Sequence, residues 1–225
     1  NRLKSNIIAT GFDGRLTSPD LHKALCEGLK DSGAKVINIG MGPTPMTYFA
    51  HFHLKADAVI MVTGSHNPSE YNGFKMVLNK HSFYAEDIQS LQKLIDQNNL
   101  KLTEGEIINQ DIKKEYINRL LQNINLNKKI KIAWDIGNGA MGTVIKEITS
   151  NLNNSDNILI NEEVDGNFPN HHPDPTVPKN MEQLVKIVKD KNCDIGLAFD
   201  GDGDRLGVVD NLGNLVWADQ YMLLL

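Results

Sequence analysis

Short apolar runs alternate along this chain with longer segments whose apolar residues recur at helical spacing. The short runs are rich in β-branched residues and predict strands, whereas the periodic segments predict amphipathic helices. The predicted strands are residues 6–10, 35–39, 58–62, 74–78, 130–134, 157–160, 195–199 and 206–210. The predicted helices are residues 19–32, 45–53, 86–97, 111–124, 141–149 and 178–191.

Several boundary residues sharpen this pattern. Ser18 is a suitable N-cap for the first helix, with Pro19 at its first position, and Gly33 supplies a C-terminal stop. The apolar face of helix 86–97 is expected to pack on a sheet as a covering layer. The polar stretch 98–110 is the best candidate for a linker between two domains.

Both halves of the chain share one order of elements: strand, helix, strand, helix, strand, polar loop and returning strand. Alternating strands and helices predict mostly parallel sheets that are covered on both faces. Ligands of such sheets gather beyond the carboxyl ends of the strands, where both polar loops lie. The fold class is therefore α/β, with two tandem α/β/α domains, mainly parallel mixed sheets and an active-site cleft between them.

Composition and charge narrow the class of partner. The net charge of −5 argues against a nucleic-acid platform or an anionic membrane surface. Cys26 and Cys193 lie in apolar regular elements and are expected to be reduced core thiols. No apolar run approaches the ~20 residues that cross a bilayer, and residues 1–5 lead into a strand rather than a signal-peptide core. We expect a cytoplasmic protein with small-molecule partners, no nucleic acid and no membrane.

The loop that follows strand 58–62 carries the first candidate chemistry. Gly64 permits a tight bend before Ser65, and His66 is adjacent. A serine hydroxyl on a stiff turn beside a histidine is typical of a nucleophile or a phosphate carrier. Asn, Pro, Gly and Ser are also ordinary loop residues, so a plain surface loop is the alternative.

A predicted turn after this loop places a lysine near it. Asn72-Gly73 favours a hairpin that folds strand 74–78 back beside strand 58–62. This return places Lys75 toward Ser65.

An acidic loop after strand 195–199 carries the second candidate chemistry. Asp200, Asp202 and Asp204 are separated by glycines, which let the backbone curl so that the three carboxylates converge. Hard oxygen ligands in this number suit Mg²⁺, and a solvated acidic turn is the alternative. An EF-hand is excluded, because Arg205 stands sixth, where glycine is required, and Asn211 stands twelfth, where glutamate is required.

Three stretches taken together carry a resemblance. Residues 63–75 begin Thr-Gly-Ser-His-Asn-Pro, residues 166–175 read Gly-Asn-Phe-Pro-Asn-His-His-Pro-Asp-Pro, and residues 199–205 read Phe-Asp-Gly-Asp-Gly-Asp-Arg. Together they resemble the α-D-phosphohexomutases, and the first two are most similar to the bacterial phosphomannomutase/phosphoglucomutase branch. The phosphoglucosamine branch usually has alanine where Gly64 stands.

The resemblance also implies a domain organisation. Family members have four domains, and this chain resembles most of the first (residues 1–107, the phosphoserine-loop domain), all of the second (108–214, the Mg-binding domain) and the start of a third (215–225). The family's initial strand and its Tyr-Asp-x-Arg-Gly loop are expected to lie outside these residues. Phe12 stands in the Gly-x-Asp-x-Arg loop where arginine is usual.

A mechanism follows from the resemblance. It implies that Ser65 carries a phosphoryl group, and that Asp200, Asp202 and Asp204 hold Mg²⁺, which also binds that phosphate. A phosphoserine adds a charge of about −1.5 to −2, so the two loops would repel without a divalent cation.

The remaining implied roles concern protons, phosphate oxygens and the substrate. Lys75 and His66 are the candidates to accept and return the hydroxyl proton, which requires a pKa moved toward neutrality. Arg205 is expected to steady phosphate oxygens. The implied substrates are mannose or glucose 1- and 6-phosphates and a hexose 1,6-bisphosphate, handled by a monomeric isomerase.

Other interpretations stay open from the residues alone. One is a catalytically degenerate protein that binds Mg²⁺ or a phosphosugar, and another is a Mg²⁺-dependent phosphatase with an aspartate nucleophile, which would leave Ser65 without a role. His171 and His172 are read as part of a structural loop rather than as metal ligands, because three prolines lie nearby. Asp13 and Asp135 sit at strand ends, where they could support the site.

Overall fold

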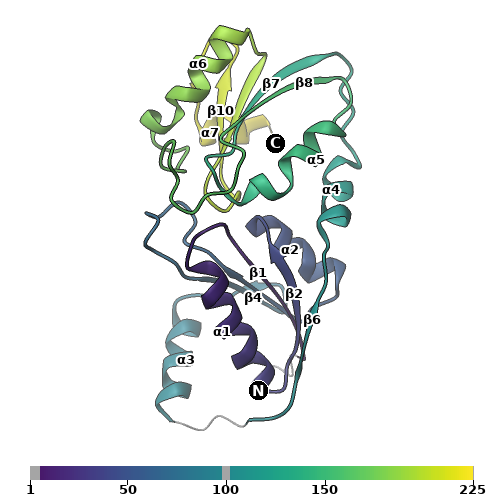
Figure 1. Ribbon diagram of the computed structural model, residues 1–225, viewed down its shortest axis with the longest axis vertical. Coiled ribbons are helices and arrows are strands. Elements are labelled where there is room, and N and C mark those ends of the chain that lie inside the picture. Colours follow the sequence, from purple (N-terminus) through teal and green to yellow (C-terminus); the bar gives the residue numbers. More distant parts are fainter. Residues whose placement is uncertain (1–5, 98–101, 225) are drawn as a thin grey trace.

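A computed structural model describes residues 6–97 and 102–224 of the chain. Two separate sheets, each flanked by helices, lie one above the other along the long axis of the molecule (Figure 1). This arrangement confirms the predicted α/β class with mixed, mainly parallel sheets.

The first sheet has six strands in the order β5-β4-β3-β1-β2-β6. β1, β2, β3 and β6 run parallel, while β4 and β5 form antiparallel pairs at one edge. The strands are β1 (Ile7–Phe12), β2 (Lys35–Met41), β3 (Ala58–Val62), β4 (Phe74–Leu78), β5 (His81–Ser82) and β6 (Glu106–Asn109). Every residue of β3 is buried, as expected for a central strand.

Alternate residues of these strands serve opposite faces of the sheet. Ile8 and Val36 pack with Cys26 of α1 (Ser18–Asp31), whereas Ala9 and Ile37 pack with the helix α2 (Thr44–His53). The two-residue period of a strand thus gives each helix its own apolar surface.

The first helix differs from expectation at its start. Thr17 occupies the N-cap position and makes no side-chain cap hydrogen bond, while the Ser18 hydroxyl donates to Asp13 Oδ1. The predicted Ser18 cap is therefore wrong, because a buried carboxylate takes the hydroxyl away from the helix end. The predicted stop at Gly33 is confirmed, with φ of +87° directly after the C-cap residue.

Two further predictions in the first half fail. α3 (Glu86–Asp96) has no buried residue, and Ile88, Leu91, Leu94 and Ile95 are each at least 37% exposed, so its apolar face does not form a closely packed layer. Residues 106–109 of the predicted linker form β6, which pairs in parallel with β2. Residues 98–101 of that linker lie outside the described part. The domain boundaries stay a prediction.

The second sheet has five strands in the order β11-β10-β9-β7-β8. β7 pairs in parallel with β8 and β9, and β10 returns antiparallel to β9. The strands are β7 (Ile130–Asp135), β8 (Ser155–Ile160), β9 (Ile195–Phe199), β10 (Leu206–Asp210) and β11 (Leu215–Val216).

The helices of the second half are shorter than predicted. The predicted helix 141–149 is a 3-10 turn followed by a short α-helix, and the predicted helix 178–191 likewise begins with a 3-10 turn. The elements are α4 (Lys113–Leu121), η1 (Ala140–Thr143), α5 (Ile145–Ser150), η2 (Pro178–Met181), α6 (Glu182–Lys191), α7 (Ala218–Tyr221) and η3 (Met222–Leu224).

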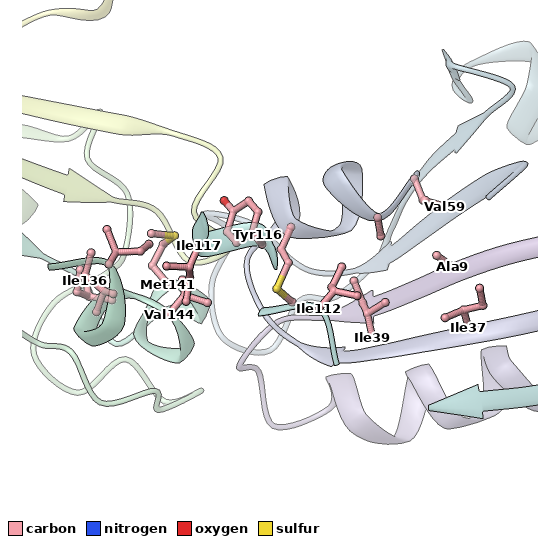
Figure 2. Close-up of a cluster of buried hydrophobic side chains, with 14 of the residues drawn as sticks. Ala9, Ile37, Ile39, Val59, Ile112, Tyr116, Ile117, Ile136, Met141 and Val144 are labelled. Atoms are coloured by element: carbon pink, nitrogen blue, oxygen red, sulfur yellow. The ribbon is translucent and has the colours of Figure 1, made fainter. Parts of the chain in front are cut away.

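One apolar cluster joins the two sheets. Figure 2 shows Ala9 and Ile37 of the first sheet and Ile136 beyond the second at its two ends, with Tyr116 of α4 between them. Residues preceding and within α4 fill the space between the halves. The two loops with candidate chemistry are therefore held in a fixed relation by a shared core.

Two simple expectations can be compared directly. Cys26 and Cys193 are both buried free thiols, as predicted, and burial raises the pKa of each. Within residues 6–97 and 102–224, no helix combines the length and apolar character needed to span a membrane.

Candidate active site

Ser65 lies just beyond the carboxyl end of β3 and is held in an unusual backbone conformation. Its φ is +50°, in the left-handed region that a non-glycine residue seldom adopts. Its N–H donates to Thr63 Oγ1 at 2.8 Å, and its hydroxyl donates to Asp200 Oδ2 at 2.9 Å. The serine loop of the first half thus contacts the acidic loop of the second.

A buried arginine shapes the serine loop. Arg15 is 1% exposed, and its Nη2 donates to the carbonyl oxygens of Ser65 and Asn67 at 2.7 and 2.6 Å. Its Nη1 donates to two more carbonyls of the same loop, at residues 68 and 71. Asp13 pairs with Arg15 Nε at 3.3 Å. Sequence reasoning missed Arg15, and it placed Asp13 only in general terms near the site.

The acidic loop joins β9 to β10 and curls around one of its own carboxylates. Asp200 Oδ1 accepts the N–H groups of Asp204 and Arg205, each at 3.0 Å. Gly203 has φ of +73°, which the tight turn requires. One carboxylate oxygen from each of Asp200, Asp202 and Asp204 lies within 4.8 Å of the others. The sequence prediction that these three carboxylates converge is confirmed.

Electrostatics favour a cation at this cluster. Burial and the neighbouring charges of Asp202 and Asp204 raise the pKa of Asp200 to about 7. Asp202 Oδ1 is buried and has no hydrogen-bond partner among the described residues. A carboxylate crowded by like charges, next to an unpartnered buried carboxylate oxygen, fits a divalent cation with hard oxygen ligands.

Lys75 reaches the same carboxylates from the first sheet. β4 pairs antiparallel with β3, with Met61 opposite Lys75, so the predicted return is confirmed. Lys75 Nζ lies 2.7 Å from Asp202 Oδ2, 2.5 Å from Asp204 Oδ2 and 3.5 Å from Ser65 Oγ. The ammonium therefore pairs with two of the three carboxylates of the cluster.

The charge state of Lys75 differs from the expectation. Burial lowers its pKa, but the carboxylates of Asp202 and Asp204 outweigh burial and raise it above the ordinary value. The expected shift toward neutrality is therefore wrong in this state. The same ion pair, together with a hydrogen bond from Thr44, lowers the pKa of Asp202 against the opposing effect of burial.

Thr44 is a second residue that sequence reasoning missed. It begins α2, its hydroxyl donates to Asp202 Oδ2, and its N–H donates to the Asp202 carbonyl at 2.8 Å. A threonine between two prolines is typical of a turn between elements. Only the folded structure therefore reveals this contact across the two halves.

His66 and Arg205 are not joined to Ser65 by side-chain hydrogen bonds in the described chain, and His66 Nδ1 is buried without a partner there. Both act on Asp174, a residue of the predicted 166–175 motif. Burial raises the pKa of Asp174, but hydrogen bonds from Thr176 and the charges of His66 and Arg205 lower it overall.

The paired histidines have a structural environment. His171 Nε2 lies 2.9 Å from Asp135 Oδ2, and its Nδ1 lies 3.0 Å from the His172 carbonyl. Asp135 is fully buried and also accepts the N–H of Gly137 and the amide of Asn161. His171 and Asp135 therefore brace the loop that follows β7, whose Gly139 packs against the acidic loop.

Two family models match the chain in succession. Residues 1–101 match phosphoglucomutase/phosphomannomutase alpha/beta/alpha domain I, and residues 114–213 match alpha/beta/alpha domain II of the same family. Among curated relatives, a phosphomannomutase/phosphoglucomutase of Pseudomonas putida is 44% identical over 96% of this chain and 47% of its own length. A phosphoglucomutase of Neisseria meningitidis is 43% identical over 96% of this chain and 47% of its own length.

Solved structures agree with this placement. A phosphoglucomutase/phosphomannomutase family protein from Burkholderia thailandensis superposes with a TM-score of 0.92 and 38% identity, covering 97% of this chain and 49% of its own. A putative phosphomannomutase from Thermus thermophilus gives 0.81 and 27%, covering 94% and 50%. This chain spans about half the length of the curated relatives it matches. The chain belongs to the phosphoglucomutase/phosphomannomutase family.

Proposed function

We propose that this chain provides the phosphoryl-transfer site of an α-D-phosphohexomutase, an isomerase that moves a phosphoryl group between C1 and C6 of a hexose phosphate. The observation that carries the proposal is the 2.9 Å contact between Ser65 Oγ and Asp200 Oδ2, which joins residues of two different sheets. The names of the curated relatives support mannose and glucose phosphates as substrates.

The reaction runs as two transfers through Ser65. Ser65 begins as a phosphoserine, and the C6 hydroxyl of a hexose 1-phosphate attacks its phosphorus. A bond from phosphorus to O6 forms and the bond to Ser65 Oγ breaks, which gives a hexose 1,6-bisphosphate. The bisphosphate then reorients in the site, so that its C1 phosphate faces Ser65. Ser65 Oγ attacks that phosphorus, the bond from phosphorus to O1 breaks, and hexose 6-phosphate leaves.

The protons are carried by two side chains of the first half. Lys75 holds its proton 3.5 Å from Ser65 Oγ, gives it to that oxygen as the phosphoryl group departs, and takes it back when Ser65 attacks. His66 accepts the proton of the sugar hydroxyl and returns it to the C1 oxygen in the second transfer. Arg205 steadies the phosphate oxygens as a fixed fork of donors.

The metal site is proposed at Asp200, Asp202 and Asp204, with the Ser65 phosphate as a further ligand. Mg²⁺ bound there would withdraw charge from the phosphorus and so favour transfer. The unpartnered Oδ1 of Asp202 supports this assignment. Lys75 balances the charge of two of these carboxylates through Asp202 Oδ2 and Asp204 Oδ2, which leaves Asp202 Oδ1 open to a cation.

The test is the intact mass of the protein after incubation with Mg²⁺ and glucose 1,6-bisphosphate. We expect a gain of ~80 Da, the mass of one phosphoryl group, that is absent in Ser65→Ala. Ser69→Ala is the matched control, because Ser69 is an exposed serine of the same loop, and it should keep the gain. Poor turnover of hexose 1-phosphate is expected from these 225 residues alone, because the chain covers 47% of its curated relatives.

Other outcomes would point elsewhere. No mass gain in the unaltered chain would favour a degenerate binding protein. A phosphoryl group found on Asp200 or Asp202 would favour a phosphatase with an aspartate nucleophile.

A further inference from the structure

A concave region lies at the amino end of β3, the opposite end from Ser65. One cavity there has a volume of about 420 Å³ and is lined by the end of α2, the residues before β3 and the turn between β4 and β5. An adjoining cavity of about 270 Å³ shares His51, Phe52 and Lys80 with it. Volumes of this size suit a small-molecule ligand.

The larger cavity is lined by more positive than negative charge. Lys55 and Lys80 are its cations, and Asp57 is its one carboxylate within the described residues. Asp57 Oδ2 already accepts the N–H groups of Asn6 and Ile7 at 2.9 and 3.0 Å. The two ammonium groups therefore outnumber a carboxylate that is engaged by the backbone, and the cavity favours an anion.

A buried histidine forms the wall shared by the two cavities. His51 is 5% exposed, lines both cavities, and its Nδ1 is sealed from solvent with no hydrogen-bond partner in the described part of the chain. Burial and the charge of Lys80 lower its pKa despite the opposing charge of Asp57. The buried imidazole contributes wall area between the two cavities.

The smaller cavity supplies an apolar surface. Tyr48, Val59 and Val77 line it together with Phe52, whose side chain is 64% exposed. Lys80 Nζ lies 5.9 Å from the Phe52 ring centroid, so the cationic and apolar parts meet at this pair. A ligand that used both parts would need an anionic group directly attached to a compact apolar body.

We propose that this joined cavity, formed by residues lining the two volumes, binds a phosphate monoester with an aromatic body. The phosphate oxygens face Lys55 and Lys80, and the ring lies against Phe52 and Val77. The site is separate from the residues that carry the proposed phosphoryl transfer and does not depend on that function.

The probe is phenyl phosphate, titrated into the whole ¹⁵N-labelled chain and followed by amide chemical shifts. Saturable shifts are expected at residues 55–57 and 79–80. The double variant Lys55→Met/Lys80→Met should weaken binding by roughly tenfold or more, since two charge-assisted contacts are lost. Lys23→Met removes an exposed lysine from α1 and should bind as the unaltered chain does.

Further arms separate the two parts of the site. Inorganic phosphate and phenol should each bind more weakly here than phenyl phosphate. The proposal is overturned if residues 55–57 and 79–80 show no saturable shifts, or if the double variant binds as tightly as the unaltered chain. Equal affinity for inorganic phosphate would overturn the aromatic assignment, and shifts confined to residues 63–66 and 200–205 would assign binding to the first site alone.

Discussion

The serine loop and the acidic loop meet at one point but are held in different ways. Arg15, from the same half, donates to four carbonyls of the serine loop, so that loop is shaped within its own domain. The acidic loop curls onto Asp200 by itself, but Lys75 and Thr44 of the other half partner its charge.

The first half therefore determines the conformation of the serine loop but the charge balance of the acidic loop. The serine loop needs the first half to adopt its strained conformation, whereas the acidic loop needs the first half, or a metal ion, to offset its crowded carboxylates. Changes within the first half should therefore act on stability, and changes at the contact should act on metal binding and phosphoryl transfer.

The largest effect is expected for Arg15→Met. The change leaves Asp13 as a buried carboxylate without its cation and removes the guanidinium hydrogen bonds to four loop carbonyls, so we expect a loss of about 3–5 kcal/mol in the free energy of unfolding. Urea unfolding measures this loss. Arg119→Met, which removes an exposed arginine of α4, should change stability by less than about 0.5 kcal/mol. Equal effects of the two variants would contradict the role assigned to Arg15.

Gly201→Ala tests the contact itself. A Cβ on Gly201 would lie 2.5 Å from the Ser65 carbonyl oxygen, so the loops must separate. Misplacement of about 1 Å can slow a transfer roughly 100-fold, and we expect that scale of loss in the rate of Ser65 phosphorylation, followed by intact mass. Gly73→Ala is the control, since its Cβ meets nothing nearer than 3.6 Å. An unchanged rate in Gly201→Ala would show that the loops need not touch.

Lys75→Met tests the charge balance of the acidic loop. The ammonium offsets the negative charge of Asp202 and Asp204, two of the three proposed metal ligands, so its removal should tighten Mg²⁺ binding by roughly tenfold even though it impairs phosphoryl transfer. Isothermal titration calorimetry with Mg²⁺ measures the affinity. Weaker Mg²⁺ binding in this variant would mean that Lys75 supports the metal site rather than competing for it.

The smallest effect is expected on stability, from a change to the pair that His171 forms with Asp135. Burial lowers the pKa of His171, but Asp135 outweighs burial and raises it overall. A raised folded pKa adds stability that is complete below the unfolded pKa and is lost as pH rises through the folded pKa. His171→Asn should therefore cost more stability near pH 5.5 than near pH 8.5, which urea unfolding at both pH values can measure. A cost that does not vary with pH would rule out the charged pair.

Patterns within short stretches predicted much of this structure. The apolar run of β3 and the turn at Asn72-Gly73 were enough to place Lys75 near Ser65, and the spacing of Asp200, Asp202 and Asp204 was enough to predict their convergence. Each of these inferences depends on local backbone geometry, which neighbouring residue types largely determine.

Features set by distant contacts escaped the sequence. Arg15 is buried because carbonyls some fifty residues away surround it, and nothing beside it in the chain signals this. β6 has only four residues, with two isoleucines between polar ends, so it is too short to show a strand period. The raised pKa of Lys75 depends on carboxylates of the other half, which no local pattern reveals.

The apolar cluster around α4 has a consequence for motion. Ile112 and Tyr116 belong to an apolar cluster that includes side chains from both sheets. A hinge motion that separated the halves would expose this buried apolar surface to water, which is unfavourable. The two halves should therefore unfold in a single cooperative transition. In the proposed reaction, the bisphosphate must then reorient within the site while the two halves of this chain keep their relative positions.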